Sequence, residues 1–276
     1  MIPRSLSTGF RIGILSIVAL FFSSCAPHLI TTPTEIPPLI SASDAVRSLA
    51  IMGEEIKTIR GAVTIKTYNG DGVATDSITG YIAYERPDKM RFTYIAPFGI
   101  TLFEAVMNGN TIALFLPQEM TAYVGAIPSE EPAPGSTSAM LFSRLRDLPF
   151  SKPNGDKFLI EHIGADSVLF GIVAKDDRWE ITEKLIFSRA DMRPKERVIL
   201  EDGVVVFRIT YSEYLSVDRY TMPGMITAHD LKNGITMEYS LASPTFNEEF
   251  PEGAFDVKAG DPWKVKDLKE FSPPSF

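Results

Sequence analysis

The sequence predicts a mainly β domain of the α+β class, built from one long antiparallel sheet that curls. Between Gly80 and Val124, turn signals divide the chain into short segments, at Pro87-Asp88, Pro97-Phe98-Gly99, Asn108-Gly109 and Pro117-Gln118. Within a segment the side chains alternate with the period of a strand, as Met90, Phe92 and Tyr94 alternate with Arg91 and Thr93. Segments of this kind continue to Leu241, which gives about twelve strands.

Composition narrows the class of protein. With 276 residues, 45% of them apolar, the chain is long enough for one sizeable core. Its formal charge of −8 gives no electrostatic basis for binding nucleic acid, and argues against adsorption to anionic lipids by charge alone. A single cysteine, Cys25, excludes an intramolecular disulfide framework and a paired-cysteine metal or redox site.

The first 24 residues have the layout of a secretory signal. Two arginines precede an apolar run from Ile12 to Phe22, which at about eleven residues is short for a membrane span. The run closes on Phe22-Ser23-Ser24-Cys25, which resembles a bacterial lipobox. That resemblance implies cleavage before Cys25, lipidation of its sulfur and a lipid anchor. Ala26 after the cysteine favours the outer membrane. The alternative is an ordinary signal peptide with an incidental cysteine.

The elements after the anchor are predicted in order. Residues 25–40, rich in proline and threonine, form a lipid-anchored tether. A helix follows from Ser41 to about Lys57, capped by Ser43. A second helix starts at Ser138 and ends before Pro149. The expected strands are 59–68, 73–84, the segments of 80–124, 157–163, 167–174, 179–188, 194–200, 204–211, 224–231 and 235–241, the last two joined by a two-residue turn at Asn233-Gly234. The two helices are the elements that can cover the inner face of the sheet.

The sequence contains no pattern of catalytic or metal-binding residues with specific spacing, so we expect no enzyme, no cofactor and no metal site. His28 lies in the tether, and His162 and His229 lie in expected strands without further ligands at metal spacing. Asp176-Asp177-Arg178 is interpreted as a hairpin turn and not as a calcium site.

Two segments are apolar on both faces. In one, Ile112, Leu114 and Leu116 oppose Ala113 and Phe115. In the other, the two opposed sets are Ile100, Leu102 and Val106 against Phe103, Ala105 and Met107. A sheet with one wet face should alternate apolar with polar residues. These strands are therefore either buried on both sides or line a dry cavity with one face, and the sequence leaves both readings open.

Several short motifs resemble the LolA/LolB family of outer-membrane lipoprotein carriers and receptors. Lys89–Leu116, with its Pro-Phe-Gly turn, is similar to LolB. Glu85-Arg86-Pro87 is similar to the arginine-proline step of LolA. Further similarity lies in the helix LFSRLRDLPF, in Met222–Ile226 and in the closing segment Phe246–Val257. The resemblance implies one domain over residues 41–276, an incomplete β-barrel whose helices form a lid over a hydrophobic cavity, with LolB the nearest member.

The same resemblance implies a function and site residues. The protein would bind acyl chains of lipoproteins at the periplasmic face of the outer membrane, with a periplasmic carrier protein as partner. Pro97, Phe98 and Gly99 would form a loop that probes the membrane, and Arg86 would hold the lid, or would simply end a strand. The candidates for cavity and lid are Phe92, Leu102, Phe103, Leu114, Phe115, Met140, Leu141 and Leu145. The alternative function is an envelope sensor or protein-interaction lipoprotein on the same scaffold.

Overall fold

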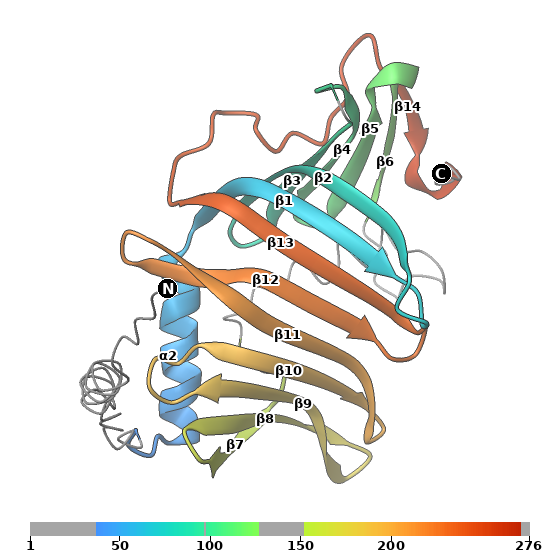
Figure 1. The fold of residues 1–276 in the computed structure, drawn as a ribbon. Helices are drawn as coiled ribbons and strands as arrows, with labels where there is room; N and C mark the ends of the chain where they lie inside the picture. Colours follow the sequence, from blue (N-terminus) through green and yellow to red (C-terminus); the bar gives the residue numbers. More distant parts are fainter. Residues whose placement is uncertain (1–36, 97, 127–151, 272–276) are drawn as a thin grey trace, which may run out of the picture. The chain divides into compact units, whose positions relative to one another are not determined.

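The computed structural model describes residues 37–96, 98–126 and 152–271. This part of the chain contains one α-helix, two short 3-10 helices and one sheet of fourteen strands (Figure 1). The elements are α2 (Ala42–Glu55), β1 (Thr58–Tyr68), β2 (Ala74–Glu85), β3 (Lys89–Ile95), β4 (Thr101–Asn108), β5 (Thr111–Leu116), η1 (Pro117–Glu119), β6 (Thr121–Ala126), β7 (Lys157–Ile163), β8 (Asp166–Lys175), β9 (Arg178–Ser188), β10 (Pro194–Glu201), β11 (Val204–Val217), β12 (Tyr220–Asp230), β13 (Ile235–Phe246), β14 (Lys264–Asp267) and η2 (Leu268–Glu270).

The sheet keeps nearly the order of the chain. From one edge to the other the strands run β14-β6-β5-β4-β3-β2-β1-β13-β12-β11-β10-β9-β8-β7. Neighbouring strands pair antiparallel except β14, which pairs parallel to β6. The pairing of β1 with β13 therefore joins two meanders, β1–β6 and β7–β13, into one curved open sheet. The prediction of a mainly β, curved antiparallel sheet is confirmed, with fourteen strands in place of about twelve.

Helix α2 begins within one residue of the predicted start, but its N-cap is not the predicted one. Ser41 and not Ser43 is its N-cap, because the Ser41 hydroxyl accepts a 3.1 Å hydrogen bond from the Asp44 N–H. The helix buries Ala45 and Leu49 against the sheet. The second expected helix, from Ser138, lies outside the described residues. Among the described residues, α2 is the one α-helix that packs on the sheet.

Two turn predictions needed correction. Asn108 pairs with Thr111, so the central residues of that hairpin are Gly109 and Asn110, and of the two only Gly109 has positive φ. The β12–β13 connection is a four-residue loop, 231–234, because Asp230 pairs with Ile235. The Asp230 carboxylate accepts hydrogen bonds from the N–H groups of Lys232 and Asn233, which fixes the longer loop.

Strands β11 and β12 are longer than predicted because their antiparallel pairing continues past Glu213 without a change of register. Glu213 has φ +50° and β11 runs on to Val217, which pairs with Tyr220 across a two-residue turn. A side chain at Gly224 would meet the Glu213 carbonyl oxygen at 2.5 Å, so the close approach of the two strands requires a glycine there. The Asp176-Asp177 turn is confirmed: Lys175 pairs with Arg178 and both aspartates have positive φ.

The sheet has two faces with different coverings. We call the face on which α2 packs the α2 face. The segment 247–263 between β13 and β14 crosses the opposite face of β2–β6, and we call it the strap and that surface the strap face (Figure 1). Within the described residues no helix is long and apolar enough to cross a membrane.

Candidate functional site

The α2 face carries a continuous apolar surface that the strand register assembles. Phe92 on β3 pairs with Ile82 on β2 and with Ala105 on β4, and Ala105 pairs in turn with Leu114 on β5. Phe103 lies beside Phe92 with ring centroids 5.8 Å apart. Phe92 and Leu114 are buried and Phe103 is half-buried. Three of the residues expected at a cavity thus lie together on this face.

The apolar surface extends beyond those three residues, across the joint between the two meanders. Buried aliphatic and aromatic side chains continue over β1, β13, β12 and β11. Around them lies a set of half-buried apolar side chains packed against the same core, which includes Ile78, Ile82, Tyr94, Leu116, Ile199, Tyr214, Tyr220, Ile226, Ile235 and Leu241. An apolar surface of this extent on one side of a sheet is suited to contact with an apolar ligand.

The far end of the α2 face is polar, which sequence reasoning missed. Arg197 on β10 and Glu183 on β9 form an ion pair with side chains only 5% and 8% exposed. The other carboxylate oxygen of Glu183 accepts a 2.7 Å hydrogen bond from the Asn154 N–H. Nearer the β7–β8 turn, the Nδ1 of His162 lies 2.7 Å from the Ser167 hydroxyl. The sequences of β9 and β10 mix charged and apolar residues, so their pattern does not show that these two charges are buried.

Two tyrosine side chains on the α2 face are largely shielded from water. Burial raises the pKa of Tyr239 and Tyr214 well above the ordinary value, because the phenolate would lose its hydration. The Tyr214 hydroxyl donates to the Pro194 carbonyl oxygen, and the Tyr239 hydroxyl lies 3.4 Å from the Met237 sulfur. Both side chains therefore stay neutral at physiological pH.

Phe115 does not share the α2 face with Leu114. It points to the strap face, where its ring meets Trp263 edge to face with centroids 5.2 Å apart. Val106, Ala113, Ala122 and Phe255 complete this second core. The strands that are apolar on both faces are therefore buried on both sides, and the strap supplies the second covering.

The strap is held at its start by polar contacts with the chain between α2 and β1. The Asn247 carboxamide oxygen accepts from the Lys57 N–H at 2.7 Å, and its amide donates to the Glu55 carbonyl oxygen at 2.9 Å. Further along, the Arg60 guanidinium stacks 5.1 Å from the Phe250 ring centroid. At the end of the strap, Trp263 leads into β14, whose parallel pairing extends the sheet.

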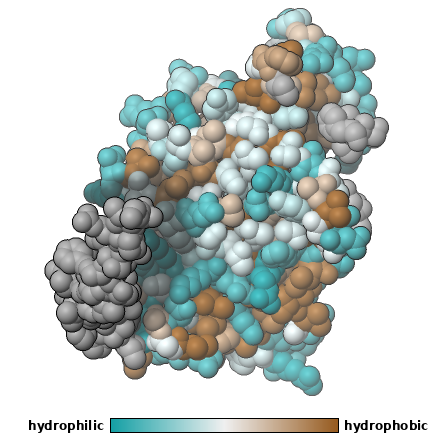
Figure 2. All heavy atoms as spheres, viewed as in Figure 1, coloured by the Kyte–Doolittle hydropathy of each residue, from teal (hydrophilic) through white to brown (hydrophobic). Residues whose placement is uncertain are grey.

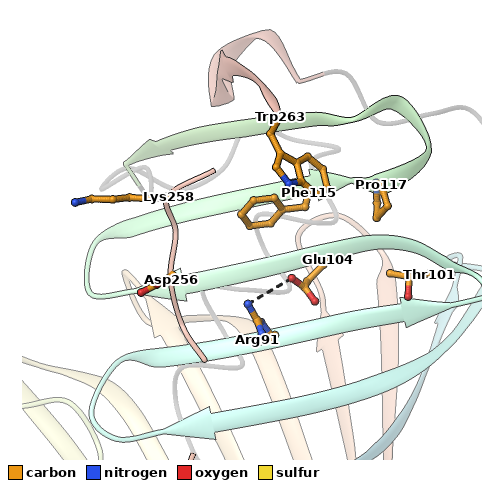
Figure 3. A pocket seen from close by; sticks show the side chains of 8 residues that line it. All are labelled: Arg91, Thr101, Glu104, Phe115, Pro117, Asp256, Lys258 and Trp263. Carbon is orange, nitrogen blue, oxygen red and sulfur yellow. Dashed lines mark ion pairs between the residues drawn. The ribbon is translucent and has the colours of Figure 1, made fainter. Parts of the chain in front are cut away.

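Between strap and sheet lies a hollow of about 260 Å³ (Figure 3). The lining residues come from β3, β4, β5, η1 and the strap, and are Arg91, Thr101, Glu104, Phe115, Pro117, Asp256, Lys258 and Trp263. We call it the strap pocket. Arg91 pairs with Glu104 at 3.5 Å, and the other oxygen of Glu104 accepts from the Thr93 hydroxyl at 3.2 Å.

The loop between β3 and β4 presents Phe98 to solvent. Phe98 is 101% exposed and has φ +75°, and Gly99 has φ +78°. A hydrogen bond from the Ala96 N–H to the Ile100 carbonyl oxygen, 2.8 Å long, closes the loop. Exposed Ile100 and Met120 lie at the same end of the sheet, because the β3–β4 and β5–β6 connections both turn there. Figure 2 shows apolar side chains gathered at this end.

The other predicted residues are placed as follows. Arg86 follows Glu85, the last residue of β2, and precedes Pro87. Its N–H donates to the Lys57 carbonyl oxygen at 2.9 Å, while its buried Nε has no hydrogen-bond acceptor among the described residues. Leu102 is half-buried at the irregularity between β3 and β4. Cys25, Pro97, Met140, Leu141 and Leu145 lie outside the described residues.

Metal-binding groups do not converge anywhere in the part of the chain that the structure describes. His162 bonds to Ser167, as stated above, and His229 lies 3.0 Å from the Thr236 hydroxyl, so each imidazole has a neighbouring hydroxyl as its partner.

Comparison with known proteins places the fold. No protein-family model and no curated protein sequence matches the chain. Among solved structures, a Vibrio parahaemolyticus domain assigned to outer membrane lipoprotein sorting superposes with a TM-score of 0.58 and 15% identity, over 78% of this chain and 96% of that one. A LolA superfamily protein from Nitrosomonas europaea superposes with a TM-score of 0.52 and 14% identity, over 79% and 98%. The chain has the LolA fold. The family resemblance predicted from the sequence is confirmed at the level of the fold.

Proposed function

We propose that this LolA-fold protein is a lipoprotein of the outer membrane that binds acyl chains on the α2 face and takes part in the reception of lipoproteins there. The observation that carries this proposal is the apolar surface of the α2 face, which continues over β1–β5 and β11–β13 and keeps a border of half-buried apolar side chains. The fold itself agrees with the proposal, since lipoprotein sorting is the role assigned to one of the similar structures.

The mechanism is transfer of an apolar chain from water to a dry surface. Each methylene group that leaves water contributes about 0.8 kcal/mol, so a stretch of six already contributes about 5 kcal/mol. No bond is made or broken. Cargo moves from a periplasmic carrier protein to this protein if the α2 face binds the acyl chain more tightly than the carrier does.

The anchor and the loop complete the proposal. Cleavage before Cys25 and lipidation of its sulfur would tie residues 25–40, as a tether, to the periplasmic face of the outer membrane, with residues 41–276 as the binding domain. A fixed anchor suits a receptor of the LolB type better than a diffusing carrier. The exposed Phe98 side chain would enter the acyl boundary of the bilayer during delivery.

The test is saturable binding of a fluorescent fatty acid to the full chain carrying Cys25→Ser, which abolishes lipidation. We expect binding, and we expect Tyr94→Asp to weaken it at least ten-fold, because about 1.4 kcal/mol separates each ten-fold step and a buried charge costs more. Tyr81→Asp is the matched control: Tyr81 lies on the neighbouring strand, faces away from α2 and is 56% exposed. It should bind as the parent does.

Two results would contradict the proposal. One is the absence of saturable binding and of co-purified lipid in a parent protein whose circular dichroism shows a folded sheet. That result would instead favour a sensor or protein-interaction lipoprotein on the same scaffold. The other is equal loss of binding in both tyrosine variants. Anchoring is tested separately, by the mass of the N-terminal peptide of the mature protein, which should begin at lipid-modified Cys25.

A further inference from the structure

The strap pocket is independent of the acyl-binding surface, because it lies on the opposite face of the sheet. Its walls come from two distant parts of the chain, β3–β5 with η1 on one side and the strap on the other (Figure 3). At about 260 Å³ it is smaller than the roughly 300–1,000 Å³ of pockets for drug-sized ligands. Its size therefore suits a single small ring.

The charges in the pocket balance. Arg91 and Lys258 supply two cations, and Glu104 and Asp256 supply two anions. Arg91 and Glu104 already face each other at 3.5 Å, whereas within the described residues Asp256 and Lys258 form no ion pair. A ligand with a net charge would thus meet as much repulsion as attraction. A neutral ligand is favoured.

The pocket offers both kinds of hydrogen-bonding group. The Arg91 guanidinium can only donate hydrogen bonds, and its buried Nε has no acceptor among the described residues. The Asp256 carboxylate on the strap can only accept hydrogen bonds, whereas the Thr101 hydroxyl can donate or accept them. A ligand that satisfies all of them must carry several groups that donate and accept at once, which is the property of hydroxyls.

An aromatic wall completes the pocket. Phe115 and Trp263 meet edge to face, with their planes at 76°, and Pro117 lies beside them. Aromatic and proline side chains provide an apolar surface of defined shape, and Trp adds one polar N–H. The C–H groups of a saturated ring can pack on this wall while its hydroxyls face the Arg91–Glu104 pair, which lies across from Phe115 (Figure 3).

From these features we propose that the strap pocket binds one ring of a neutral saccharide, either a free sugar or a unit of a glycan chain. The aromatic wall takes the C–H side of the ring. Asp256 and Glu104 accept hydrogen bonds from its hydroxyls, and Arg91 and Lys258 donate to their oxygens. The site joins strap to sheet, so an occupied pocket also holds the strap in place.

The experiment uses Trp263 as the reporter. The chain has two tryptophans, so Trp179→Phe in the full chain carrying Cys25→Ser leaves Trp263 alone. Its emission is titrated with glucose, with N-acetylglucosamine and with a linear oligomer of N-acetylglucosamine. Glucuronate and glucosamine serve as ring-matched ligands of negative and positive charge. Circular dichroism checks the fold of every variant.

We expect a saturable change in Trp263 emission with a neutral sugar, and weaker binding of both charged sugars. Asp256→Ala and Lys258→Ala should each weaken the neutral sugar about ten-fold, since each removes a hydrogen bond to a charged group. Glu252→Ala, an exposed strap carboxylate outside the pocket, should leave affinity unchanged. Tighter binding of the oligomer identifies a glycan as the source, and equal affinity identifies a free sugar.

Three outcomes would overturn the proposal. The first is no saturable change with any neutral sugar in folded protein. The second is binding that neither Asp256→Ala nor Lys258→Ala alters, which would put the sugar elsewhere. The third is tighter binding of glucuronate or glucosamine than of glucose, which would replace the neutral class with a charged one. None of these outcomes bears on acyl binding, which is measured on the other face.

Discussion

Replacing Phe115 by alanine tests the assignment of the two faces. Phe115 is only 8% exposed and packs on Trp263, so the substitution leaves a cavity between sheet and strap. Phe→Ala substitutions in cores cost about 3–5 kcal/mol, and the edge-to-face pair contributes about 0.5–1.5 kcal/mol of that loss. Yet the side chain does not touch the α2 face. We expect a large loss of stability with no loss of fatty-acid affinity.

Urea unfolding followed by circular dichroism measures the first quantity, and fatty-acid titration below the unfolding transition measures the second. A double-mutant cycle with Trp263→Ala should give a coupling of about 0.5–1.5 kcal/mol. Tyr81→Ala is the control, an exposed aromatic whose loss should change stability by less than about 0.5 kcal/mol. The reasoning fails if Phe115→Ala costs under about 1 kcal/mol, or if it abolishes fatty-acid binding in folded protein.

Three further predictions concern the loop, the buried ion pair and alkaline pH. Phe98→Glu should weaken association with lipid vesicles without changing stability, because the side chain is fully exposed; Ile163→Glu, an exposed apolar site on β7, is the control, and equal association in flotation assays would remove Phe98 from membrane contact. Glu183→Gln should lower the free energy of unfolding in urea by about 3–5 kcal/mol, because it leaves Arg197 buried without its carboxylate partner. Replacing both residues by leucine should recover most of that loss. A loss below about 1 kcal/mol for Glu183→Gln would contradict burial of the pair. The pKa of Tyr239 is raised in the folded protein, so its contribution to the free energy of unfolding is complete below the unfolded pKa of about 10. Above that pH, stability should fall by up to about 1.4 kcal/mol per pH unit. Tyr239→Phe should flatten that decline, and an unchanged slope would refute the assignment.

Sequence reasoning was most successful where local chemistry decides the structure. Turn residues with positive φ, such as Asp176-Asp177, fix where a chain reverses, and alternation fixes which side chains share a face. Where the position of a turn depends on the register with the partner strand, the prediction was wrong. The hairpin at Gly109 moved by one residue, since the register of β4 with β5 is set by packing on both faces. The Asp230 loop was missed for the same reason: its carboxylate bonds to backbone that only the folded loop presents.

The strap and β14 show what a sequence cannot reveal locally. Lys264–Asp267 has no apolar alternation, so nothing in KVKD predicts a strand; it becomes one because Trp263 packs on Phe115 and the Lys264 N–H reaches the Met120 carbonyl oxygen at 2.8 Å. The burial of Arg197 with Glu183 is equally non-local. Each residue alone is expected at the surface, and only the pairing of β9 with β10 makes them partners.

The strap changes which apolar residues bear on function. Before its position was known, Phe115 and Leu114 were equal candidates for a cavity, because both faces of β5 are apolar. The strap covers one face with Phe255 and Trp263, so the apolar residues there are explained by folding alone. The α2 face has no such covering strand or strap among the described residues, and its half-buried border remains over several strands. Acyl binding on this half-buried border is the proposal made above, and the tyrosine pair on β2 and β3 can test it directly.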